Sequence, residues 1–263
     1  MPTLRRVPTR PKLPRTRLGT RFLRPASGPP PPRQPPVLVD YAETTWVGNG
    51  AKSTGTSVSW QTGDRLVVLG IASSQTGSLP VPTTTGSGVT FTADTPVTTA
   101  STDWANTWTA TAAANGSAAI DSTGETGSGA WGMAVWVYRG SDGFGNRAAN
   151  GDTAKTISLS RSQADSAVIF GLGDTSGGAT TGYAWTPTVD NEREVQANAN
   201  HSVYVGDWTD QVTAGTTSYG ITGGTATGNL AKIALEILGA TAAAAGLDPA
   251  PTAHPITQLA GYF

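Results

Sequence analysis

The stretch Asp64-Arg-Leu-Val-Val-Leu-Gly-Ile71 decides the fold, because it is a short aliphatic run that follows a turn. A run of this length and composition is typical of a strand with both faces buried. A similar run, Asp165-Ser-Ala-Val-Ile-Phe-Gly-Leu172, follows about 100 positions later. We therefore expect Leu66–Leu69 and Val168–Phe170 to lie in central strands.

A second pair of segments supports an internal repeat. Gly129–Gly140 resembles Gly228–Gly239 at an offset of 99 positions. Each half alone would have few strands and a poor core. We therefore expect the two halves to close on each other as one sandwich of about eight or more strands.

Other short runs alternate apolar and polar residues and are separated by glycine-rich turns, as in antiparallel strands. Hydrophobic residues make up 37% and charged residues 13% of the chain, which also favours many short strands and turns. The predicted fold is all-β: a single, jelly-roll-like β-sandwich without helices beyond a short turn. The further expected strands are Val37–Tyr41, Thr56–Trp60, Val89–Thr92, Trp104–Ala110, Trp131–Tyr138, Thr156–Leu159, Glu194–Ala197, Ser202–Trp208, Ser218–Ile221 and Ala231–Leu238.

The composition divides the chain into three parts. Residues 1–36 contain eleven prolines and are expected to form an extended arm, because proline fixes φ and lacks a backbone donor. Residues 37–239 form the predicted sandwich body, and residues 240–263 form a C-terminal tail. The apolar end of this tail is either a docking peptide or a frayed terminus. No stretch approaches the roughly 18 apolar residues of a membrane span, and no secretory signal is recognisable.

Charge is distributed unevenly between these parts. The arm holds nine of the 17 Lys/Arg residues and none of the 18 acidic residues, so the rest of the chain has a formal charge of −10. A basic arm on an acidic body is suited to docking against a neighbouring subunit. Arg15, Arg17, Arg21 and Arg24, with Phe22 between them, are the predicted partner-binding residues. Nucleic-acid binding is less favoured, because the acidic body would repel phosphates.

Catalytic and metal chemistry have little support in the sequence. Cysteine is absent, and His201 and His254 are the only histidines, so we expect no metal site, no cofactor and no catalytic residue. Glu192 and Glu194 could form a carboxylate pair, but a solvated strand edge explains them better. Calcium binding by Asp residues in glycine-rich turns is a minor alternative. The protein is therefore predicted not to be an enzyme.

The chain contains eight tryptophans, which are candidates for core packing or for ligand binding. Trp104 and Trp108 are four positions apart and share one strand face, whereas Trp131 and Trp136 are five apart and lie on opposite faces. Trp104, Trp108 and Trp208 are candidates for stacking on a glycan. Packing in the core is the alternative, and it is favoured for large aromatic residues.

Four segments of the body resemble β-sandwich proteins of actinobacterial tailed phages and prophages, typically minor tail or other virion structural proteins. The likeness covers about residues 41–239. It implies a virion structural protein that contacts capsid, neck or tail subunits and other copies of itself, in a minor tail, neck or capsid-decorating position. A carbohydrate-binding module that recognises a host-surface glycan for attachment is the alternative. The segments are Trp60-Gln-Thr-Gly-Asp-Arg-Leu-Val-Val-Leu-Gly70, Trp131-Gly-Met-Ala-Val-Trp-Val-Tyr-Arg-Gly140, Tyr204-Val-Gly-Asp-Trp208 and Gly215-Thr-Thr-Ser-Tyr-Gly220.

Overall fold

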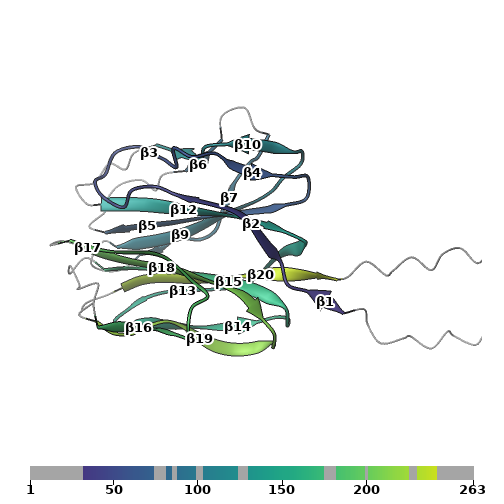
Figure 1. Ribbon diagram of the computed structural model, residues 1–263. Helices are drawn as coiled ribbons and strands as arrows, with labels where there is room; N and C mark the ends of the chain where they lie inside the picture. Colours follow the sequence, from purple (N-terminus) through teal and green to yellow (C-terminus); the bar gives the residue numbers. More distant parts are fainter. Residues whose placement is uncertain are drawn as a thin grey trace, which may run out of the picture. The chain divides into compact units, whose positions relative to one another are not determined.

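A computed structural model describes most of the body (Figure 1). The described residues are 32–73, 81–84, 88–98, 103–123, 130–174, 182–198, 201–224 and 230–241. The chain divides into two units, Met1–Pro30 and Pro31–Phe263, and the described residues all belong to the second. All regular structure in these ranges is β-strand, with every pairing antiparallel, so the prediction of an all-β fold is confirmed. These ranges contain no helix that could cross a membrane.

The first half of the body consists of one large sheet and a broken outer layer. The large sheet has the order β2-β12-β5-β9-β7, with β8 also on β9, and the outer layer is formed by β4-β10 and β3-β11-β6. The bounds are β2 Val37–Glu43, β3 Lys52–Ser53, β4 Val58–Trp60, β5 Arg65–Ser73, β6 Pro82–Thr83, β7 Thr92–Ala93, β8 Val97–Thr98, β9 Trp104–Thr111, β10 Gly116–Ala118, β11 Asp121–Ser122 and β12 Ala130–Arg139.

The second half repeats this plan. Its large sheet has the order β13-β20-β15-β18-β17, and its outer sheet has the order β14-β19-β16. The short strand β1 pairs with the last residues of β20, on the edge that β13 occupies further back. The bounds are β1 Arg33–Gln34, β13 Ser141–Asp152, β14 Thr156–Arg161, β15 Ser166–Asp174, β16 Tyr183–Thr186, β17 Asn191–Asn198, β18 His201–Gln211, β19 Gly215–Gly223 and β20 Leu230–Thr241.

Equivalent side chains occupy equivalent positions in the two halves. Ser59 Oγ donates to Ser117 Oγ at 3.1 Å across β4 and β10, and the Oγ atoms of Ser158 and Ser218 lie 3.2 Å apart across β14 and β19. The offset of 99 also relates β12 to β20, with corresponding residues facing corresponding layers. The internal repeat read from the sequence is therefore a repeat of strand order, pairing and facing.

The other repeated run needs one correction. Gly70 and Gly171 align in sequence, but a Cβ at Gly70 would meet Trp108, whereas one at Gly171 would meet Leu69. The two glycines thus face opposite sides of their sheets. A bulge after Ser166 supplies the extra residue that shifts the facing by one position.

Three apolar cores hold together the sheet layers that Figure 1 shows edge-on. Val67 and Ile169 belong to the central core between the two large sheets, Val68 to the outer core of the first half, and Phe170 to that of the second. We expected one sandwich with one core. In the described residues each half has a core of its own, because the strands of both large sheets are apolar on both faces and each face needs a covering layer.

A buried polar cluster joins the two halves within the central core. The carboxylate of Asp207, which is fully buried, accepts hydrogen bonds from Trp136 Nε1 at 3.2 Å and Asn191 Nδ2 at 2.9 Å. Arg193 binds the same carboxylate through Nε and Nη2, and its guanidinium lies 4.4 Å from the ring centroid of Tyr41. Trp136 and Tyr41 belong to the first half, and the other three residues to the second.

The body extends slightly beyond its predicted limits of 37 and 239. Arg33 in β1 lies opposite Thr241 at the end of β20, and Arg33 Nη1 donates to Gly239 O at 2.9 Å. The same nitrogen forms an ion pair with Asp142 at 3.2 Å. The last residues of the predicted arm therefore form a short edge strand.

Candidate functional site

The predicted partner-binding residues of the arm lie outside the described residues, as does the C-terminal tail after Thr241, which contains His254. The residues of the arm concerned are Arg15, Arg17, Arg21, Phe22 and Arg24.

The structure places the three candidate glycan-stacking tryptophans in the cores. Trp104 and Trp108 are each 2% exposed in the outer core of the first half, and Trp208 is 1% exposed in that of the second. Trp104 and Trp108 do share a face, with ring centroids 6.2 Å apart. Their indoles cannot stack on a sugar from solvent, so the core-packing alternative holds for all three.

The predicted facing of the other tryptophan pair is confirmed. Trp131 packs in the outer core of the first half, and Trp136 packs in the central core. Both are buried, because β12 has a covering layer on each face.

The carboxylates that the sequence offered as a pair are separated by a bulge between Glu192 and Glu194. Oε2 of Glu192 accepts hydrogen bonds from the Tyr183 hydroxyl at 2.8 Å and from Trp185 Nε1 at 2.7 Å. Burial, followed by this hydrogen bond, raises the pKa of Tyr183 to about 12. Glu192 thus anchors two half-buried aromatic side chains on β16.

His201 lies at the start of β18 and is buried. Its Nε2 lies 3.0 Å from the carbonyl oxygen of Trp46, and burial lowers the pKa of its imidazole. The described ranges contain no group of three or more His, Cys, Asp or Glu side chains placed to hold a metal ion.

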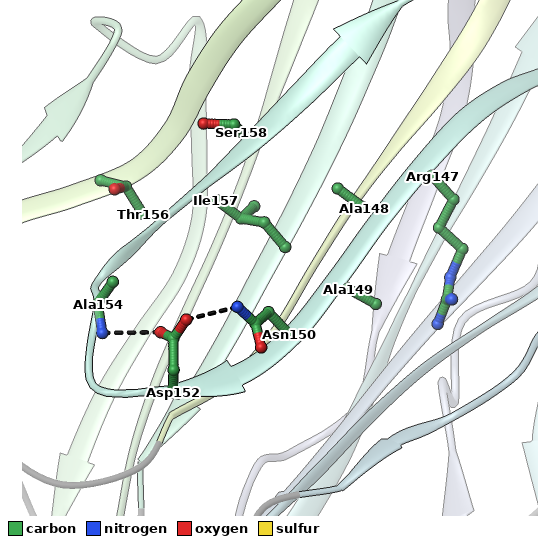
Figure 2. A pocket seen from close by; sticks show the side chains of 9 residues that line it. All are labelled: Arg147, Ala148, Ala149, Asn150, Asp152, Ala154, Thr156, Ile157 and Ser158. Carbon is green, nitrogen blue, oxygen red and sulfur yellow. Dashed lines mark hydrogen bonds between the residues drawn. The ribbon is translucent and has the colours of Figure 1, made fainter.

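A side groove lies between the edge strands β13 and β14 of the second half (Figure 2) and has a volume of about 650 Å³. Asp152 accepts hydrogen bonds from Asn150 Nδ2 and, at 2.8 Å, from the Ala154 backbone N–H. The fully buried ammonium of Lys232 also binds this carboxylate, and that hydrogen bond is the main cause that lowers its pKa. Arg147 lies at the other end of the groove and donates to Thr95 O.

Another groove, of about 360 Å³, occupies the equivalent place in the first half, between β2 and β4. Strand and turn chemistry bring its residues together. Gly63, at φ 88°, closes the turn that follows β4, and in this turn the Asp64 carboxylate accepts from the Gln61 backbone N–H at 2.8 Å. We call it the β2–β4 groove. Its lining residues are Val39, Asp40, Ser59, Trp60, Gln61, Asn115, Gly116 and Arg139.

The charged groups of the β2–β4 groove are held by hydrogen bonds to the protein. Oδ2 of Asp40 accepts from the Ser59 backbone N–H at 2.7 Å. Arg139 is bidentate to the buried carboxylate of Asp64, through Nε at 3.1 Å and Nη2 at 2.9 Å, and this hydrogen bonding raises the pKa of the guanidinium. These groups are oriented before any ligand arrives.

Asn115 is fixed in the same way on the opposite side of the groove. Its Oδ1 accepts from the Thr62 backbone N–H at 2.8 Å and from the Thr62 hydroxyl at 3.3 Å. This site could not be recognised from the sequence, because its polar residues come from four separate segments. The only local signals were the turn residues that flank Trp60 and precede Gly116.

No protein-family model, curated protein or solved structure matches the chain. The function must therefore be inferred from the residues and their geometry.

Proposed function

We propose that the protein is a structural component of a tailed bacteriophage particle, of minor tail, neck or capsid-decorating type, that is anchored through its N-terminal arm. The observation that supports this most directly is the pairing of β1 with β20. Arg33 lies opposite Thr241, so the arm and the C-terminal tail join the body at neighbouring positions on one sheet edge. Attachment through both segments would leave the other surfaces of the body free.

The charge distribution supports the same role. Arg33, the last basic residue of the arm, pairs with the half-exposed carboxylate of Asp142. The eight other basic residues of the arm precede it and offer the same chemistry to acidic groups on neighbouring subunits. Other copies of this chain, with their acidic bodies, would be suitable partners.

The strand order supports a capsid-like architecture. Numbered in chain order from 1 to 8, the strands β13–β20 of the second half form one sheet with the order 1-8-3-6-5 and another with the order 2-7-4. The first half has the same order when β3 and β4, β7 and β8, and β10 and β11 are each counted as one position. The 1-8-3-6 and 2-7-4 parts of this order resemble a jelly roll, a fold that virion proteins and lectins use, whereas position 5 lies beside position 6 instead of position 4. We propose that the body is a tandem pair of jelly rolls packed through their larger sheets.

Removal of residues 1–31 tests the anchoring role, because it leaves β1 intact. A second variant replaces Arg15, Arg17, Arg21 and Arg24 with Gln in the full-length chain. We expect both proteins to melt at the wild-type temperature and to be depleted from purified particles at least about tenfold. Wild-type incorporation of the truncated protein would contradict anchoring by the arm.

A further inference from the structure

We propose that the β2–β4 groove binds the neutral end of a glycan, a pyranose ring that presents adjacent free hydroxyls. This binding role goes beyond the structural role proposed above. The groove volume of about 360 Å³ lies within the range of small-molecule sites, roughly 300 to 1,000 Å³.

The floor of the groove is apolar. Trp60 is 2% exposed and lies against Gly116, where a Cβ would come within 2.8 Å of the indole. The absence of a side chain at Gly116 therefore lets its backbone pack directly on the indole, so the ring supports the groove from below without being open to a stacking sugar. Trp60 Nε1 is also buried and makes no hydrogen bond within the described ranges, so the polar groups that a ligand can reach are those on the rim.

The rim offers hydrogen-bonding capacity that the protein itself does not use. In the described part of the chain, Asn115 Nδ2, Arg139 Nη1 and the side-chain amide of Gln61 have no hydrogen-bond partner. The Asp40 carboxylate accepts one hydrogen bond on each oxygen and retains further lone pairs. A mixture of donors and acceptors on planar groups can bind adjacent hydroxyls, which both donate and accept.

The charge of the groove favours a neutral ligand. The Arg139 guanidinium is already neutralised by Asp64, so the Asp40 carboxylate leaves the groove with a net negative charge. Sulfated, phosphorylated or sialylated ligands would be repelled. The Asp40 carboxylate and the amides of Gln61 and Asn115 are compatible with uncharged hydroxyls.

The equivalent groove of the second half lacks these properties. Asn150 and Lys232 direct their donors to Asp152, so its polar groups satisfy one another rather than a ligand. Its apolar lining consists of small side chains and Ile157, without an aromatic ring. The β13–β14 groove therefore serves as a matched internal control.

The test uses the full-length chain and a printed array of neutral, sialylated and sulfated glycans, followed by titration calorimetry with the best neutral glycan. Gln61→Ala removes a side chain that makes no internal hydrogen bond. Asn115→Asp retains the acceptor for Thr62 and removes the free donor. Thr156→Ala is the control in the β13–β14 groove. Thermal melting of each variant establishes that the fold is intact.

We expect binding to neutral glycans that weakens about tenfold in each of the two β2–β4 variants and is unchanged in Thr156→Ala. Neutral-glycan binding that is insensitive to Gln61→Ala and Asn115→Asp would refute this location. Binding confined to acidic glycans would refute the ligand class. Absence of glycan binding at millimolar concentration would refute the proposal while leaving the structural role untouched.

Discussion

Replacement of Asp207 should weaken the contact between the two halves and lower the free energy of unfolding, because its carboxylate is the centre of the polar cluster between them. Asp207→Ala leaves the Arg193 guanidinium, whose side chain is 17% exposed, without its partner. It also leaves Trp136 Nε1 and Asn191 Nδ2 without their acceptor. Loss of one member of a buried ion pair typically costs about 3–5 kcal/mol. We expect the free energy of unfolding to fall by about that amount.

The assay is urea unfolding followed by tryptophan fluorescence, with the slope of the transition used to detect a change in cooperativity. Asp207→Asn keeps the shape and one acceptor, and should lose about 1.5–3 kcal/mol, the value of hydrogen bonds to a charged group. Asp210→Asn is the control on the same strand, because Asp210 is exposed, and it should change stability by less than about 0.5 kcal/mol.

The substitution Asp207→Ala in a variant that already carries Arg193→Met identifies the cause of the lost stability. Most of the expected cost arises from the uncompensated charge on Arg193, so Asp207→Ala should cost much less when Arg193 is already Met. A loss below about 1 kcal/mol for Asp207→Ala in the wild-type background would refute the view that this cluster holds the halves together. An equal loss in both backgrounds would refute the assignment to the ion pair.

Three further predictions concern the second half. Gly145→Ala places a Cβ 2.2 Å from Oε2 of the buried Glu236 and should destabilise by about 1–3 kcal/mol in urea unfolding; an unchanged midpoint would contradict this. Lys232→Met introduces the residue type of the equivalent Met133 and should leave the melting temperature unchanged or raise it, whereas a clear decrease would show that the buried ammonium is required. Tyr183, with its pKa raised to about 12, stays protonated at pH 10 in the folded state. The stability that it contributes should be full below pH 10 and be lost as pH rises toward 12, as ¹³C NMR of the tyrosine rings and melting at each pH would show.

The central strands could be predicted from the sequence because short, continuous apolar runs are typical of strands that are buried on both faces. Leu66–Leu69 and Val168–Phe170 lie within β5 and β15, which both have strands on either side. The opposite facing of Trp131 and Trp136 followed from strand parity alone. These inferences needed only local geometry.

The number of layers could not be predicted in the same way. An apolar run shows that both faces of a strand are covered, but not whether one sandwich or two provide the cover. The spacing of Trp104 and Trp108 is likewise the same for an exposed platform and for a core. Only the pairing of β9 with β5, and the outer layer above it, place both indoles in a core.

The β2–β4 groove was beyond sequence reasoning for a different reason. Asp40, Gln61, Asn115 and Arg139 are separated by 21, 54 and 24 positions. No local motif connects them, and each residue alone has an ordinary structural interpretation. Their juxtaposition depends on the antiparallel pairing of β2 with β12 and of β4 with β10.

The internal repeat explains how one groove can remain free while the other is closed. Both halves need the same edge strands to complete a sandwich, so both inherit a groove between the first two strands of the repeat. In the second half Lys232, at the position of Met133, extends a cation to Asp152 and consumes its acceptors. In the first half the corresponding position is apolar, and the rim groups are fixed by backbone N–H groups and by Asp64 instead. Stabilisation of the fold and hydrogen bonding to a ligand therefore use different atoms in the β2–β4 groove, which is the condition for a site that is rigid and still unsatisfied.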